Sequence, residues 1–209
     1  PFAQLATVGA ATTTLGLASG IANIYHRHPG VMLMGANTVA EATGGRMILG
    51  MGVSSPAIVS KVRGIDYGKP LAFLRTYLEA MEASMYTAVA PAESVPVVLA
   101  ALGPRMLELA AEKTAGAHPY NTTPEHTAMA REVMGPDAGL FVEQKVIFTE
   151  DPAVARATGG KVLRFYSRAP GYVNAWKRMG FSDDDISTQS DRLIDAIVAW
   201  GTADQIEAR

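Results

Sequence analysis

The 209-residue sequence contains no cysteine. Disulfide bonds and thiolate metal sites are therefore excluded, and this absence fits the reducing cytoplasm. There is no long run of like charges and the net charge is -2, so no strong field exists to attract nucleic acid or an anionic membrane. No apolar stretch reaches the roughly 18 residues of a membrane span. These absences predict a cytoplasmic globular protein that binds neither nucleic acid nor a membrane.

Several catalytic signatures are missing as well. The sequence has no phosphate-binding P-loop, no H-E-x-x-H zinc motif and no Ser-His-Asp order, so NTPase and hydrolase interpretations have no support. The segment Gly50-Met51-Gly52 lacks the third glycine of a dinucleotide-binding fingerprint, because Ser55 stands at that position. A long loop also follows this segment, whereas the fingerprint requires a helix there.

The sequence does contain a regular alternation of strand-like and helix-like segments. Hydrophobic residues make up 48% of the chain, enough for one sizeable core, and we expect a single domain over residues 1–209. The expected strands cover 15–21, 46–53, 96–102, 117–120 and 140–149. The expected helices cover 29–43, 69–85, 104–115, 124–134, 153–168, 172–179 and 190–200. This alternation predicts a parallel sheet with helices outside, either an open sheet or a barrel.

The ends of the expected strands are unusually rich in small residues. Ligands of parallel α/β proteins bind beyond the carboxyl ends of the strands. Three such ends, at residues 18–21, 50–53 and 100–103, consist largely of Gly, Ala and Ser. Small side chains leave room for a flat ligand against the backbone, although each end alone could simply permit close helix packing. Three ends of this kind together favour a pocket.

The segment ALGPRM, residues 101–106, offers a site for an anion. A helix is expected to begin at Pro104, so free backbone N–H groups point out of its first turn, and Arg105 adds a positive charge. A phosphate suits this chemistry. The alternative is that Arg105 is an ordinary solvated side chain.

The four histidines are candidates for different tasks. His26 and His28 are two residues apart and have no third ligand at a matching spacing, so a loop that lines a pocket explains them better than a metal site does. His118 lies on a short expected strand, where we expect a hydrogen-bonded residue at the rim of the pocket, with a general base as the alternative. His126 follows a helix start and is expected at the surface.

Together these stretches resemble the luciferase-like monooxygenase superfamily, particularly its actinobacterial branch of oxidoreductases that depend on the deazaflavin coenzyme F-420. The matching segments follow the family's order and cover nearly the whole chain: LGLASGIANIYHRHPGVM, EATGGRMILGMGVSS, YGKPLAFLRTYLEAM, VPVVLAALGPRMLELAAEKTAGAHPY and SDRLIDAIVAWG. The resemblance implies an α/β fold of the TIM-type (β/α)8 barrel, of the bacterial-luciferase-like kind, with about five β/α units in this chain.

The resemblance also implies a site and a reaction. A hydride would pass between coenzyme F-420 and a small organic substrate. A bulge at Ser19-Gly20-Ile21, often with a cis peptide bond in such proteins, would support the flavin ring, and the loop 23–28 would rim the pocket. The implied cofactor-binding residues are Ser19, Gly20, Ile21, Gly52, Val53, Ser54, Ala100, Ala101, Leu102, Gly103 and Arg105. The candidate catalytic residues are His118 and His26, and no metal is expected.

Two alternatives share this fold. One is a monooxygenase that uses FMN and oxygen, and the other is a non-catalytic barrel fragment that binds a flavin or another subunit. By the resemblance, the family's first two strands would precede Pro1 and its last strand would follow Arg209. Family members often dimerise, so we expect a homodimer. The loop 54–68 occupies the position of a variable insertion and would either close over the pocket or remain at the surface.

Overall fold

The larger of two parallel sheets forms the centre of the structure, a computed structural model that describes residues 1–209. Its strand order is β1-β3-β4-β5-β6, and β2 also pairs with β3; every pairing is parallel. The strands are β1 (Leu17–Ala18), β2 (Ala22–Asn23), β3 (Met47–Gly52), β4 (Val97–Leu99), β5 (Gly116–Ala117) and β6 (Gly139–Leu140). The predicted parallel α/β arrangement is confirmed, although β5 begins and ends earlier than the expected strand 117–120.

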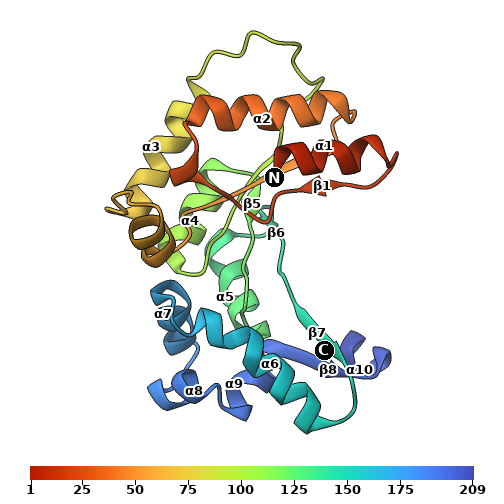
Figure 1. The fold of residues 1–209 in the computed structure, drawn as a ribbon, viewed down its shortest axis with the longest axis vertical. Coiled ribbons are helices and arrows are strands. Elements are labelled where there is room, and N and C mark those ends of the chain that lie inside the picture. The colour runs from red at the N-terminus through yellow and green to blue at the C-terminus, as the bar shows by residue number, and fades with distance from the viewer.

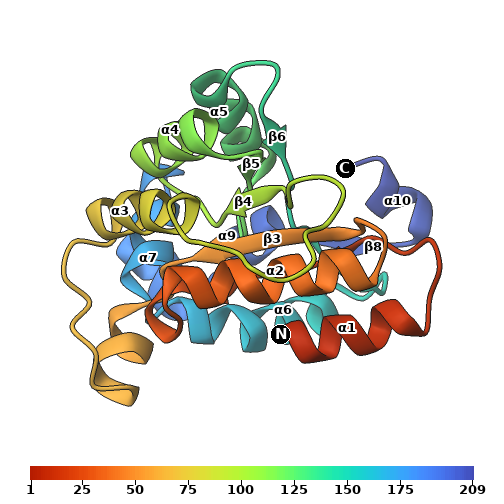
Figure 2. The same ribbon diagram turned by 90° about the horizontal axis from the view of Figure 1, so that it is seen from above.

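Helices cover the outside of this sheet, as Figures 1 and 2 show. Successive helices pack against one another: α1 (Phe2–Ala10), α2 (Pro29–Ala42), α3 (Pro70–Glu82), α4 (Pro104–Lys113) and α5 (Pro124–Met134). Helices α2 to α5 each have a proline in the first turn, where its missing N–H costs no hydrogen bond. A core of 22 buried residues, including Met51, Leu74 and Leu107, lies between these helices and the sheet. Their expected positions are confirmed, whereas α1 was not predicted.

The remaining elements form a smaller unit with its own sheet and core. Strand β7 (Lys145–Phe148) pairs in parallel with β8 (Val198–Gly201). The helices are α6 (Pro152–Tyr166), α7 (Pro170–Arg178), α8 (Asp183–Thr188), α9 (Asp191–Ile197) and α10 (Ala203–Glu207). A separate core of eight buried residues centres on Trp176. We call α1–β6 the first half and β7–α10 the second half; an extended segment joins them in Figure 1.

Two expectations about the second half are wrong. The strand expected over 140–149 is divided into β6, in the larger sheet, and β7, in the smaller one. The helix expected over 190–200 ends at Ile197, and the chain continues as β8. A continuously apolar run such as IVAW fits a buried helix and a buried strand equally well, and here pairing with β7 decides. None of the helices combines the length and the apolar character needed to cross a membrane.

Candidate functional site

The first strand is interrupted at the predicted bulge. Ser19, Gly20 and Ile21 separate β1 from β2, and the Gly20–Ile21 peptide bond is cis. The buried Ser19 hydroxyl donates a hydrogen bond to the carbonyl oxygen of Gly50, at 2.8 Å. A Cβ at position 50 would collide with the Ser19 carbonyl oxygen, so only glycine permits this close approach of the two strands. The predicted bulge and its cis peptide bond are confirmed.

The neighbouring strand ends lie against this bulge. A Cβ at Gly52 would lie 3.0 Å from both the Ala100 Cβ and the Ile21 Cδ1. The bulge and the ends of β3 and β4 therefore meet at one place, as the small residues there predicted. Val53 is half-buried and Ala101 is fully buried beside them. The backbone then turns sharply at Ser54, whose φ of 57° is left-handed.

His118 faces the bulge from the end of β5. Its Nδ1 lies 2.5 Å from the carbonyl oxygen of Phe141. Because a carbonyl oxygen can only accept, Nδ1 carries the proton, and Nε2 of the neutral ring presents a lone pair. This Nε2 lies 3.9 Å from the position that a Cβ would take on Gly20. The structure thus places a possible proton acceptor beside the cis peptide bond.

The other candidate base, His26, lies elsewhere. It is exposed on the short 3-10 helix η1 (Ile24–His26) and contacts the Asn23 side chain at 3.5 Å. His26 lines a groove of about 920 Å³ between η1 and α3, which none of the other predicted site residues lines. His28 caps α2, because its Nδ1 accepts the Gly30 N–H at 3.2 Å. The two histidines therefore have separate roles.

The loop 54–68 is tied to η1 by aromatic side chains. It contains a π-helical turn, η2 (Ala57–Val62). The Tyr25 hydroxyl donates to the Tyr67 carbonyl oxygen at 2.6 Å, and the two rings stack with centroids 5.2 Å apart. The Tyr67 hydroxyl in turn donates to the carbonyl oxygen of Ser54, at 3.1 Å. Burial raises the pKa of Tyr67 to about 12, which keeps this donor protonated at neutral pH.

Helix α4 begins at Pro104, as predicted, and a cation that was not predicted lies beside this helix start. Gly103 is the N-cap and Pro104 occupies the first turn. Arg105 is exposed on that turn. Arg178, the last residue of α7, instead lies with a guanidinium nitrogen 3.3 Å from the position of a Cβ on Gly103. Nothing in the local sequence around Arg178 signals this contact, because it depends on how the second half packs on the first.

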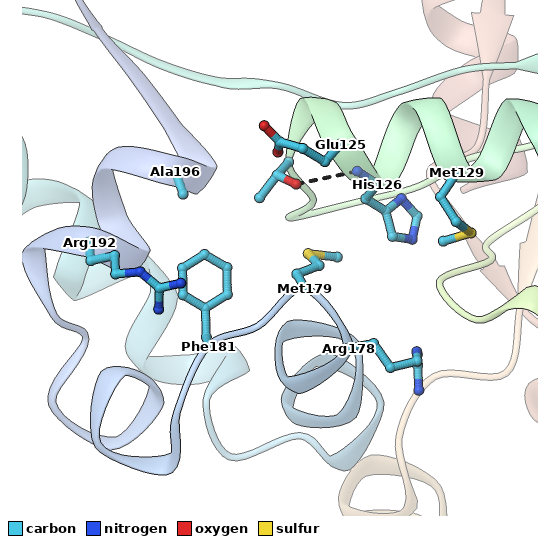
Figure 3. A pocket seen from close by; sticks show the side chains of 9 residues that line it. Glu125, His126, Met129, Arg178, Met179, Phe181, Arg192 and Ala196 are labelled. Carbon is cyan, nitrogen blue, oxygen red and sulfur yellow. Dashed lines mark hydrogen bonds between the residues drawn. The ribbon is translucent and has the colours of Figure 1, made fainter.

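His126 is buried, and the expectation that it lies at the surface is wrong. It is 4% exposed, and its Nε2 donates to the carbonyl oxygen of Leu102 at 2.9 Å. Its Nδ1 has no hydrogen-bond partner. The start of α5 is covered by the second half, which explains the burial: His126 lines a cavity of about 430 Å³ together with Arg178, Phe181 and Arg192 (Figure 3). Burial and the nearby Arg178 charge lower the pKa of His126.

Fold and strand ends together define a β/α-barrel protein with a cis-peptide bulge at the carboxyl end of its first strand. The chain belongs to the luciferase-like monooxygenase family, whose model matches residues 1–209. The match extends over both halves of the structure.

Comparisons with individual proteins agree with this family. A Mycobacterium tuberculosis protein provisionally named a coenzyme F-420-dependent oxidoreductase is 24% identical over 98% of this chain and 77% of its own length. The coenzyme F-420-dependent tetrahydromethanopterin reductase from Methanopyrus kandleri has a TM-score of 0.70 at 20% identity, over 98% of this chain and 76% of that one. An FMN complex of a type II Baeyer-Villiger monooxygenase from Pseudomonas putida has a TM-score of 0.66 at 15% identity, over 100% and 71%. The predicted TIM-type fold is thereby confirmed.

Proposed function

We propose that this protein binds coenzyme F-420 and transfers a hydride between that deazaflavin and a small organic substrate. The names of the Mycobacterium tuberculosis and Methanopyrus kandleri relatives support the choice of cofactor. The single observation that carries the proposal is the bulge at Gly20–Ile21 with the Nε2 of His118 beside it. A homodimer, a cytoplasmic location and a single domain over residues 1–209 stay predictions.

The residues at the strand ends suit a ligand that has a flat ring at the bulge and a phosphate farther away, at the start of α4. Gly20 is exposed, and a Cβ there would meet only His118, so the bulge leaves a surface on which a ring can lie. Gly52, Val53 and Ser54 would border the ring or the ribityl chain. The segment 100–103 and the first turn of α4 would hold the phosphate through backbone N–H groups.

The protein's own contribution to the reaction follows from these positions. A bound deazaflavin supplies the carbon atom that accepts or gives the hydride. The bulge at Ser19-Gly20-Ile21 would support the ring, and a substrate alcohol or carbonyl would lie between the ring and His118. The His118 Nε2 would accept the alcohol proton during oxidation and return it during reduction. The hydrogen bond from Nδ1 to the Phe141 carbonyl oxygen holds the imidazole in the orientation for this transfer.

The cofactor is tested by competition between two flavins. Purified protein is offered F-420 and FMN together, and the retained compound is identified by native mass spectrometry. We expect F-420 to be retained, whereas retention of FMN alone would favour the monooxygenase alternative. Retention of neither would overturn both enzyme proposals and leave the non-catalytic fragment.

The role of His118 is tested separately with His118→Gln. We expect F-420 affinity to stay within about twofold, while hydride transfer with a panel of small alcohols and carbonyl compounds falls by about 100-fold or more. His26→Gln is the matched control, because His26 is exposed and lines the other groove; its activity should stay near wild type. The reverse result would assign the base to His26.

A further inference from the structure

We infer that Arg178, and not Arg105, is the side chain that pairs with the cofactor phosphate at the start of α4. This inference rests on the proposed function, because it names a residue for the same cofactor. It concerns a side chain from the second half of the molecule that reaches a site built by the first half. The contact of Arg178 with Gly103 is the observation that starts the argument.

Arg178 is held at this position by its own helix. Trp176, two residues earlier on α7, is fully buried, and its indole N–H donates to the carbonyl oxygen of Asn121 at 2.9 Å. Asn121 belongs to the loop between β5 and α5, next to the strand ends. The base of the Arg178 side chain is therefore fixed relative to Gly103, and its guanidinium group lies against the backbone of that residue.

The guanidinium group of Arg178 is free, unlike the cations around it. Lys177 pairs with Asp183 at 2.5 Å, and Arg192 pairs with Asp185 at 2.9 Å while it lies 4.7 Å from the Phe181 ring centre. Arg178 makes no ion pair and no hydrogen bond with the protein. An anion at this place could accept a charge-assisted hydrogen bond from the unpaired guanidinium and further hydrogen bonds from the backbone N–H groups at the helix N-terminus.

An unpaired polar atom lies close to the same helix start, although it suits a hydroxyl group or a water molecule and not the phosphate itself. His126 is more than nine-tenths buried, and its Nδ1 has no partner, although buried polar atoms are nearly always hydrogen-bonded. His126 lines the same cavity as Arg178, as Figure 3 shows. Its other nitrogen holds the carbonyl oxygen of Leu102, the residue before Gly103. Of these two groups only the Arg178 guanidinium can pair with a phosphate, and the His126 Nδ1 can accept from a hydroxyl group or a water molecule.

Arg105 is the weaker candidate on geometry. Both arginines are exposed, but only Arg178 has atoms within 4 Å of the Cβ position of Gly103, whereas Arg105 has none there. Arg178 can contact the phosphate directly, and direct charge-assisted hydrogen bonds are worth more than screened attraction.

The experiment compares deazaflavins with and without the phosphate. Dissociation constants are measured by deazaflavin fluorescence for F-420, for 5-deazariboflavin 5′-phosphate and for 5-deazariboflavin, of which the last two differ only in the phosphate. Arg178→Met should weaken binding of F-420 and of 5-deazariboflavin 5′-phosphate roughly 10- to 100-fold, as loss of a charged hydrogen bond does. Its affinity for 5-deazariboflavin should stay within about twofold. Arg105→Met, the matched control, should change F-420 binding by less than about threefold, and Arg178→Lys should restore part of the loss.

Each other outcome has a definite meaning. If Arg178→Met weakens all three ligands equally, or if Arg105→Met has the larger effect, the inference about Arg178 is overturned. If wild type binds F-420 and Arg178→Met binds it equally well, the inference fails while the proposed function stands. If wild type does not bind F-420, the proposed function itself fails. Thermal unfolding of each variant checks that the exposed Arg178 side chain is not needed for folding.

Discussion

The two halves of the molecule contribute different kinds of groups to the candidate site. The first half, with five parallel pairings and a core of 22 buried residues, supplies backbone: the bulge at Gly20, the small end of β3 and the start of α4. The second half, with two strands and a core of eight buried residues, supplies the charged side chain of Arg178. Backbone features are encoded locally, whereas the charge reaches the site only through packing between the halves.

The largest loss of stability is expected when Trp176, which lies at the contact between the halves, is replaced. Trp176→Ala removes a fully buried side chain and its hydrogen bond to Asn121, so unfolding free energy should fall by about 3–5 kcal/mol. Denaturant unfolding measures this loss. Trp200→Ala is the matched control, because Trp200 is only half-buried and bonds to Asp195 within the second half. Equal losses for the two variants would contradict a special role for Trp176.

This difference also explains which parts could be predicted from the sequence. The bulge, the meeting of the small strand ends and the start of α4 each follow from a few consecutive residues, such as LASGI and LGPR. The division of the strand 140–149 and the strand β8 depend on which sheet accepts each segment. The burial of His126 and the position of Arg178 likewise depend on contacts between distant segments. The spacing of apolar residues along the sequence carries no information about such contacts between distant segments.

The next largest loss of stability is expected from a substitution that disturbs the close packing of the first half. Gly50→Ala places a methyl group against the Ser19 carbonyl oxygen, a backbone atom that cannot move aside cheaply, so we expect a loss of about 3 kcal/mol. In the second half, Gly160→Ala meets only ordinary contacts, 3.4 Å from Ile194, on the helix α6. There alanine should stabilise by about 0.5–1 kcal/mol because it favours helix. Thermal melts of both variants test the contrast, which fails if Gly50→Ala is neutral.

The covered start of α5 predicts a smaller, pH-dependent effect. Burial lowers the pKa of His126 in the folded protein below its unfolded value near 6.5. The folded state therefore favours the neutral ring, so this stabilisation is complete above about pH 6.5 and is lost as the pH falls toward the folded pKa. His126→Gln, which retains a donor for the Leu102 carbonyl oxygen, should lose less stability than wild type between pH 7.5 and 5. Identical pH profiles would contradict this prediction, because they would show that folding does not change the proton affinity of His126.

The smallest effect concerns a second contact between the halves, around Lys145 of β7. Its ammonium group lies 3.8 Å from the ring centre of Tyr120 in the first half and 5.7 Å from that of Tyr166 in the second. The two tyrosine hydroxyls are 2.9 Å apart. With 14% of its side chain exposed, Lys145 is well shielded from water, which strengthens a cation–π contact.

A double-mutant cycle with Lys145→Met and Tyr120→Leu isolates this contact. Lys145→Met alone also removes the ion pair with Glu143, at 3.1 Å, so the single variant overstates the contribution of the ring. The cycle cancels that loss, and we expect a coupling free energy of about 0.5–1 kcal/mol in denaturant unfolding. A coupling near zero would mean that Tyr120 and Lys145 are not in stable contact. The position of Arg178 beside Gly103 would then depend more strongly on the other contacts between the halves, above all the Trp176 hydrogen bond to Asn121.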